Sequence, residues 1–238
     1  MKELQTRRLT LKSKLAEGKF AHAEFSIFEA KPSNEVKGGI LLIQEIFGVN
    51  AHIQKLARHY AEKGYLVWAP AYFDHVEPNV ELGYNDSTFA RGRELAKAIS
   101  WDQALDDTKI AADALRKALP ADRNKIAAIG FCWGGSLAWI SATRLGRTFD
   151  ACVSYYGRQV WDYREEKPQV PVMLHYGEKD PMIPMLNVRA IEKAQPNLPV
   201  YVYPAGHGFN CDERRDYDPE AARLAEARTF KFLEENGI

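Results

Sequence analysis

The sequence GFCWGG at positions 130–135 surrounds a single thiol with glycines, between two apolar segments. The spacing G-x-C-x-G is that of a nucleophile elbow, a strained strand-to-helix turn on which the nucleophile stands exposed. Gly130 and Gly134 are needed because side chains would clash across such a turn. The positive N-terminal end of the following helix favours a thiolate and offers N–H groups to an oxyanion. The pattern predicts that Cys132 is a nucleophile, although isolated cysteines are more often small buried hydrophobes.

A thiol nucleophile needs a base, and the base needs an orienting group. Asp180 follows the apolar segment VPVMLHYG, and His207 follows the segment PVYVYP. An aspartate in a loop is usually an ordinary turn residue, and each position alone is a weak signal. The order nucleophile, acid, histidine along the chain is, however, that of α/β-hydrolases. Together the three residues predict a Cys132–His207–Asp180 triad.

The remaining histidines and cysteines fit this chemistry less well. His52 and His59 lie on a predicted helix. His22 precedes an edge strand, His75 lies in the long loop, and His175 lies inside a strand. Cys152 lies within a strand pattern and is expected in the core. Cys211 is close to His207 in the sequence, but its neighbours lack the glycines of an elbow.

Strand and helix patterns alternate along the chain and must position these residues. This alternation predicts one α/β domain over residues 1–238, with a mostly parallel twisted sheet and helices on both faces. Sites in such sheets lie at the carboxyl ends of the strands. Segments 7–13 and 23–30 predict an antiparallel hairpin at the edge, and 71–90 predicts a long surface loop. The parallel strands are expected at 38–44, 65–70, 125–130, 150–157, 170–177 and 199–204.

Composition argues against several classes of protein. Lys plus Arg and Asp plus Glu both number 32, so no overall charge favours nucleic acid or an anionic membrane. The N-terminal segment lacks the apolar core of a secretory signal, and no apolar stretch approaches the ~20 residues of a membrane span. The 3 cysteines are dispersed, without CxxC or HExxH, which favours a reducing compartment and no zinc site. We therefore expect a cytoplasmic protein without a metal, acting as a monomer or small homo-oligomer.

Three stretches give the chain a resemblance to the dienelactone hydrolase family, the carboxymethylenebutenolidases. They are QEIFGVNAHI at 44–53, GFCWGG at 130–135 and AGHGF at 205–209. The cysteine elbow is the most distinctive of them, because most relatives of this fold use serine. The resemblance implies a single α/β-hydrolase domain, a Cys-Asp-His triad, and hydrolysis of an enol lactone without a metal or organic cofactor.

The resemblance also implies roles for three further positions. The family's glutamate at the position of Glu45 contacts the resting thiol and helps to deprotonate it when substrate arrives. Glu45 ends the strand next to the elbow, so its carboxylate could reach Cys132, where a protonated thiol would be less easily oxidised. An ordinary salt bridge is the alternative. The backbone N–H groups of Ile46 and Trp133 match the family's oxyanion hole.

The substrate pocket departs from the family pattern. The family binds the carboxylate of its substrate with two arginines, and Arg93 in FARGREL matches one of them, with Arg91 two residues away. The second should follow AGHGFN directly, where this chain has Cys211, and Arg214 or Arg215 would have to replace it. Losing one fork of a bidentate clamp should weaken carboxylate recognition. The sequence thus leaves open whether the substrate carries a carboxylate.

The function expected from the sequence is hydrolysis of an activated ester or enol lactone through a thioester acyl-enzyme. Esters are favoured over amides because a thiolate leaves a tetrahedral adduct more easily than an unprotonated amine. Three alternatives stay open: an amidase or peptidase-like thiol hydrolase, a redox-sensing thiol protein on a hydrolase fold, and a non-catalytic interaction domain.

Overall fold

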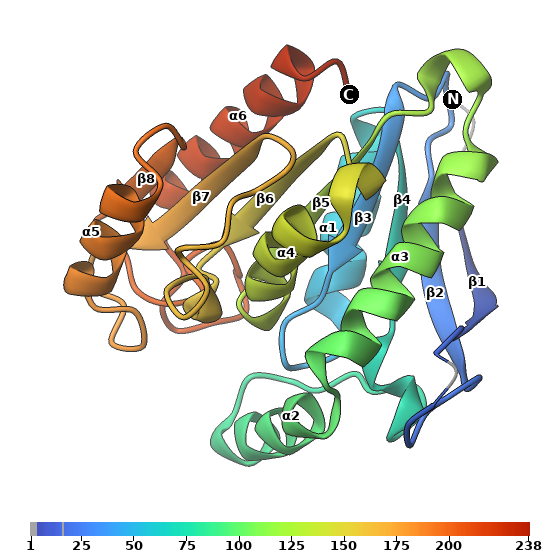
Figure 1. Ribbon diagram of the computed structural model, residues 1–238, viewed down its shortest axis with the longest axis horizontal. Helices are drawn as coiled ribbons and strands as arrows, with labels where there is room; N and C mark the ends of the chain where they lie inside the picture. Colours follow the sequence, from blue (N-terminus) through green and yellow to red (C-terminus); the bar gives the residue numbers. More distant parts are fainter. Residues whose placement is uncertain (1–3, 16) are drawn as a thin grey trace.

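The computed structural model of this chain describes residues 4–15 and 17–238. One eight-stranded sheet runs through it in the order β1-β2-β4-β3-β5-β6-β7-β8 (Figure 1). The strands are β1 (Gln5–Lys12), β2 (Glu24–Lys31), β3 (Gly38–Ile43), β4 (Tyr65–Pro70), β5 (Ile126–Phe131), β6 (Ala151–Tyr155), β7 (Val172–Gly177) and β8 (Val200–Tyr203). β2 pairs antiparallel with both β1 and β4, and the other neighbours are parallel. The mostly parallel sheet with an antiparallel N-terminal edge is therefore confirmed.

Helices cover both faces of this sheet. The α-helices are α1 (Ala51–Glu62), α2 (Asp86–Ala98), α3 (Trp101–Ala118), α4 (Trp133–Arg144), α5 (Met185–Ala194) and α6 (Pro219–Glu235). Short 3₁₀ turns are η1 (Tyr72–His75), η2 (Ala121–Arg123), η3 (Gly146–Thr148) and η4 (Arg158–Val160). α3 and α4 lie in front of the sheet in Figure 1, whereas α1 and α6 lie behind it. No helix in the described part of the chain has both the length and the apolar character needed to cross a bilayer.

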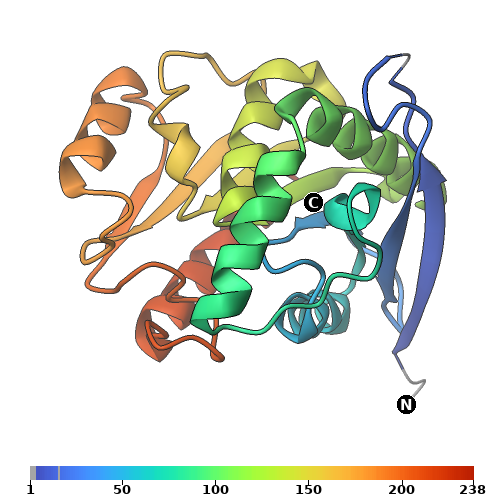
Figure 2. The same ribbon diagram turned by 90° about the horizontal axis from the view of Figure 1, so that it is seen from below.

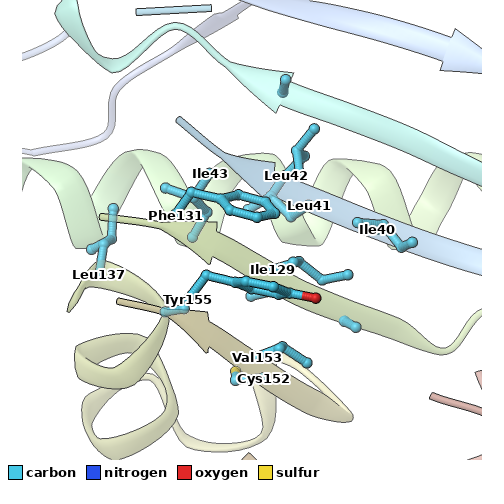
Figure 3. Packing of buried hydrophobic residues seen from close by; sticks show 14 of the residues in the cluster. Ile40, Leu41, Leu42, Ile43, Ile129, Phe131, Leu137, Cys152, Val153 and Tyr155 are labelled. Atoms are coloured by element: carbon cyan, nitrogen blue, oxygen red, sulfur yellow. The ribbon is translucent and has the colours of Figure 1, made fainter. Parts of the chain in front are cut away.

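The central strands are apolar throughout because helices cover both of their faces. Every residue of β3, β4, β5, β6 and β7 is buried. Figure 3 shows Phe131 and Tyr155 from neighbouring strands side by side, next to Ile43, and the two rings stack at 4.6 Å. This packing fixes the strand ends from which the polar side chains emerge.

The prediction of a long surface loop at 71–90 is partly wrong. Tyr72 and Phe73 are buried in η1, and α2 begins at Asp86. Asn85 caps this helix by accepting a hydrogen bond from the Thr88 N–H at 3.1 Å, and the Thr88 hydroxyl accepts one from the Asn85 N–H in return. This reciprocal cap starts the helix inside a segment that has no hydrophobic period, so periodicity alone missed it.

Candidate active site

Cys132 lies on the sharp turn between β5 and α4. Its φ is +54°, a left-handed value that a residue with a side chain adopts only under strain. A Cβ at Gly130 would clash with the backbone of Gly134, and one at Gly134 would clash with the carbonyl oxygen of Ile43. The Cys132 N–H donates to the Tyr155 carbonyl oxygen at 2.9 Å, which ties the turn to the next strand. The glycines thus permit the close approach that turns the thiol out of the core.

His207 lies between Cys132 and Asp180. Its Nε2 is 3.2 Å from the sulfur of Cys132, and its Nδ1 is 2.6 Å from Oδ2 of Asp180. The other carboxylate oxygen of Asp180 accepts hydrogen bonds from the N–H groups of Met182 at 2.7 Å and Ile183 at 3.2 Å. The loops after β5, β7 and β8 therefore bring the three side chains together at one edge of the sheet, as the order of the residues predicts.

The electrostatics of His207 are set by these two partners. Burial by itself disfavours the charged imidazole, but the facing Cys132 sulfur and the Asp180 carboxylate outweigh it and raise the pKa of His207. Both His207 and Asp180 are buried, whereas Cys132 is partly exposed. A substrate can therefore reach the sulfur from one side while the histidine stays shielded behind it.

Ile46 and Trp133 are the two residues whose backbone N–H groups the resemblance implies as an oxyanion hole. Trp133 is the first residue of α4, and Ile46 follows β3. Both residues line the same cavity as Cys132. Neither N–H donates a hydrogen bond to another residue among 4–15 and 17–238. Two unpaired donors beside one cavity, one of them at the N-terminus of a helix, are suited to bind an anionic oxygen.

Glu45 is fully buried and points toward two partners other than the thiol. Its carboxylate accepts hydrogen bonds from the Tyr84 hydroxyl at 3.1 Å and from Nη1 of Arg214 at 3.1 Å. Burial and this carboxylate together raise the pKa of Tyr84. The carboxylate forms no hydrogen bond with Cys132, the contact that the resemblance implies, and the sulfur is paired with His207. Arg214 is the stronger partner for a buried carboxylate because its charge compensates the cost of burial.

A cavity of about 760 Å³ opens over the sulfur. Trp133 stacks on Trp101 with ring centroids 5.6 Å apart, and both line the cavity together with Phe89. Arg93 also lines it, with its guanidinium 4.7 Å from the centre of the Phe89 ring. Arg91 instead pairs with carboxylates on the surface. The structure thus separates the two arginines that the sequence could not align.

The segment after His207 contributes no cation to this cavity. Cys211 is buried, and burial together with Glu45 raises the pKa of its thiol to about 12. Arg214 is paired with Glu45, and Arg214 and Arg215 line a separate, smaller cavity. Neither arginine therefore takes the place of the family's second arginine in the cavity over Cys132.

This region contains two further residues that the sequence did not predict. Tyr84 lies in the segment interpreted as a loop, and nothing in its neighbours indicates contact with Glu45. Arg158 directly follows the segment DACVSYYG and lines the cavity over Cys132. The rule that sites lie at the carboxyl ends of strands could have indicated Arg158. Among residues 4–15 and 17–238, no group of three or more His, Cys, Asp and Glu side chains could hold a metal.

Comparison with known proteins identifies relatives over most of the chain. Residues 25–237 match the model of the dienelactone hydrolase family. A relative from Synechocystis sp., provisionally named a carboxymethylenebutenolidase, is 33% identical over 77% of this chain and 80% of its own length. Carboxymethylenebutenolidase 1 of Cupriavidus pinatubonensis is 28% identical, with coverage of 88% and 91%. A crystal structure from Klebsiella pneumoniae, provisionally described as a dienelactone hydrolase, superposes with a TM-score of 0.77 at 27% identity, covering 97% of this chain and 99% of that one. These similarities confirm the α/β-hydrolase fold.

Proposed function

Because this chain belongs to the dienelactone hydrolase family and is a carboxymethylenebutenolidase-like ester hydrolase, we propose that it cleaves an activated ester or enol lactone at Cys132. His207 and Asp180 complete the proposed triad. The observation that carries this proposal is the continuous line of contacts from sulfur to imidazole to carboxylate, at 3.2 and 2.6 Å. A histidine held by an acid beside a thiol is the arrangement that nucleophilic catalysis requires.

Acylation begins with attack of the Cys132 thiolate on the carbonyl carbon of the substrate. A carbon–sulfur bond forms, and the carbonyl electrons move to an oxyanion that the Ile46 and Trp133 N–H groups stabilise. The adduct collapses by breaking the carbon–oxygen bond to the alcohol or enol part. Charged His207 donates its proton to that leaving oxygen where the oxygen needs one. A thioester results, with a neutral imidazole where this proton has moved and a charged one where an enolate has left without it.

Deacylation reverses these roles. Water attacks the thioester carbonyl, and neutral His207, oriented by Asp180, accepts its proton. When the leaving group is an enolate that stays in the cavity, the enolate can accept this proton instead. The carbon–sulfur bond then breaks, which releases a carboxylic acid and restores the thiolate. The net reaction consumes one water for each ester bond.

The proposed role of Glu45 depends on which group its carboxylate contacts. To contact the thiol, as the resemblance implies, its carboxylate must give up Arg214 and Tyr84. In the structure, Arg214 pairs with the Glu45 carboxylate, and the sulfur of Cys132 faces His207. Substitution of Glu45 by glutamine tests this role, and we expect slower acylation together with weaker packing of Arg214.

The triad is tested by following an activated ester through one turnover. We expect p-nitrophenyl acetate to give a burst of nitrophenolate with one acetyl group on Cys132, detected as a mass increase of the intact chain. Cys132→Ala should remove both the burst and the mass increase. Full turnover by Cys132→Ala would overturn the proposal. Equal rates on p-nitroacetanilide would favour an amidase, and thiol oxidation without any burst would favour a redox sensor.

The proposal extends to the setting of the enzyme. Cys132, Cys152 and Cys211 are all free thiols, which suits a cytoplasmic location. We expect a single catalytic domain over residues 1–238, active as a monomer or small homo-oligomer on a small molecule, and acting without nucleic acid, a membrane or a cofactor.

A further inference from the structure

The cavity over Cys132 has an unbalanced charge. Arg93, Lys97 and Arg158 line it, and no aspartate or glutamate among residues 4–15 and 17–238 does. The chain as a whole carries equal numbers of acidic and basic residues, at 32 each. Within the same described residues, none of the three cations forms an ion pair or donates a side-chain hydrogen bond. The positive charge of this cavity is therefore available to a ligand.

Two separate elements contribute these cations. Arg93 and Lys97 are four residues apart on α2, so they share one face of that helix. Arg158 comes from η4, which follows β6 and is far from α2 in the sequence. Figure 2 shows α2 crossing this side of the molecule in front of the strand ends. A ligand above the sulfur thus meets positive charge from α2 and from the turn after β6.

The turn that carries Arg158 is held firmly against the helix that begins at the elbow. The Gln159 N–H donates to the Ser136 hydroxyl oxygen at 3.1 Å, and that hydroxyl donates to the Gln159 side chain at 2.6 Å. A Cβ at Gly157 would clash with the backbone of Gly135 and Ser136, which shows how closely the turn packs on α4. The backbone of Arg158 is therefore fixed relative to Cys132, and only its side chain needs ordering on binding.

We propose that Arg158 is a specificity-determining residue, which binds with Arg93 and Lys97 a carboxylate on the acyl part of the substrate. This inference rests on the proposed hydrolysis at Cys132. Guanidinium groups match the two oxygens of a carboxylate, and the apolar wall of Phe89, Trp101 and Trp133 suits the carbon skeleton between carboxylate and ester. Arg158 would thus supply the second arginine that Cys211 and the paired Arg214 cannot.

The test uses two esters that differ only at the end of the acyl chain. 4-Nitrophenyl hexanoate ends in a methyl group, and mono(4-nitrophenyl) adipate has a carboxylate in that place. We expect Arg158→Gln to lower kcat/KM for the adipate about 10-fold, mainly through KM, and to change the rate on the hexanoate less than about 2-fold. Added salt should lower the ratio of kcat/KM for the adipate to kcat/KM for the hexanoate, and the decrease should be larger in the wild type than in Arg158→Gln.

Matched variants separate this effect from a general loss of charge. Arg147 is also exposed in a short 3₁₀ turn, but it does not line the cavity, so Arg147→Gln should leave both rates unchanged. Arg93→Gln should behave like Arg158→Gln, whereas Arg91→Gln should not. If Arg158→Gln changes both esters equally or neither, the inference fails even while Cys132 cleaves the hexanoate. If the hexanoate is not cleaved, or is cleaved by Cys132→Ala, the proposed function itself fails.

Discussion

Two pairs of residues, each a cysteine and a histidine, lie in different environments of this chain. The contrast between the two pairs shows which environment allows chemistry. Cys152 and His175 lie inside β6 and β7, and both are fully buried. Cys132 and His207 lie just beyond strand ends, at the carboxyl edge of the same sheet. The residue types are identical, so the difference in chemistry comes from position alone.

Burial in the strands suppresses charge on both side chains. Burial raises the pKa of Cys152 to about 12 and lowers the pKa of His175 to about 3. His175 is held instead by two hydroxyl groups, with Nδ1 2.9 Å from Tyr203 Oη and Nε2 3.2 Å from Thr229 Oγ1. A neutral imidazole satisfies both, as donor at one nitrogen and acceptor at the other. At the edge of the sheet, the sulfur of Cys132 and Asp180 instead favour a charged His207.

Substitution of each cysteine by alanine should give the largest difference between the two environments. We expect Cys132→Ala to lower kcat/KM on an activated ester at least about 10⁴-fold, because no other group can accept the acyl part. Cys152→Ala should retain turnover and lose about 1–2 kcal/mol of stability through the small cavity it leaves. Ester kinetics and urea unfolding of both variants measure this, and comparable activity losses would show that position does not separate the two thiols.

Thiol labelling should sharpen the same contrast without any substrate. In the native protein we expect iodoacetamide to modify Cys132 about 10³-fold faster than Cys152 or Cys211, since the buried thiols react only when the chain opens. Peptide mass spectrometry over time gives each rate. In urea the three rates should converge, and rapid native labelling of Cys152 would contradict its place in the core.

The sequence alone was sufficient to predict the strands that carry or precede these cysteines and histidines. Long buried runs predict parallel strands, and strand ends at one edge follow from parallel pairing, so Cys132, Asp180 and His207 could be expected to converge. The same patterns place Cys152 and His175 inside strands. These inferences succeed because hydrophobic periodicity reflects burial, and burial of apolar surface is the main driving force of folding.

Contacts between loops were harder to predict. Glu45 could pair with Cys132, Tyr84 or Arg214, and the structure pairs it with the last two. The choice depends on where segments from distant parts of the chain meet, and no local pattern encodes it. Arg158 follows β6, so the rule on strand ends could have indicated it, but the cavity that it shares with α2 depends on tertiary packing. Side-chain partners at a loop junction are set by tertiary packing and not by residue spacing.

Asn in place of Asp180 should give a smaller effect than loss of the thiol. We expect Asp180→Asn to lower kcat/KM about 10²-fold, because His207 loses the carboxylate that orients it and favours its charge. The thiol itself remains a strong nucleophile, which limits the loss. On the alkaline side of its pH profile, kcat/KM should begin to fall at a lower pH in this variant than in the wild type. An unchanged profile would mean that Asp180 does not set the charge of His207.

The smallest expected effect is a change of stability with pH that originates at His175. Its pKa is about 3 in the folded protein and near 6.5 when unfolded, so the unfolded chain binds a proton first as the pH falls. The stability that His175 contributes is therefore fully present above pH 6.5 and decreases below it, by about 2 kcal/mol at pH 5. We expect His175→Gln to lose this part of the pH dependence, measured as the difference in unfolding free energy from the wild type at pH 7.5 and pH 5.

His207→Gln serves as the control for this measurement at the edge of the sheet. There the raised pKa gives the opposite sign, because the stabilisation is present at low pH and is lost as the pH rises through the folded pKa of His207. The two variants should therefore depart from the wild type in opposite directions as the pH falls. A difference between wild type and His175→Gln that stays constant from pH 7.5 to 5 would mean that His175 does not remain neutral in the folded strand, and the contrast between the two histidines would not hold.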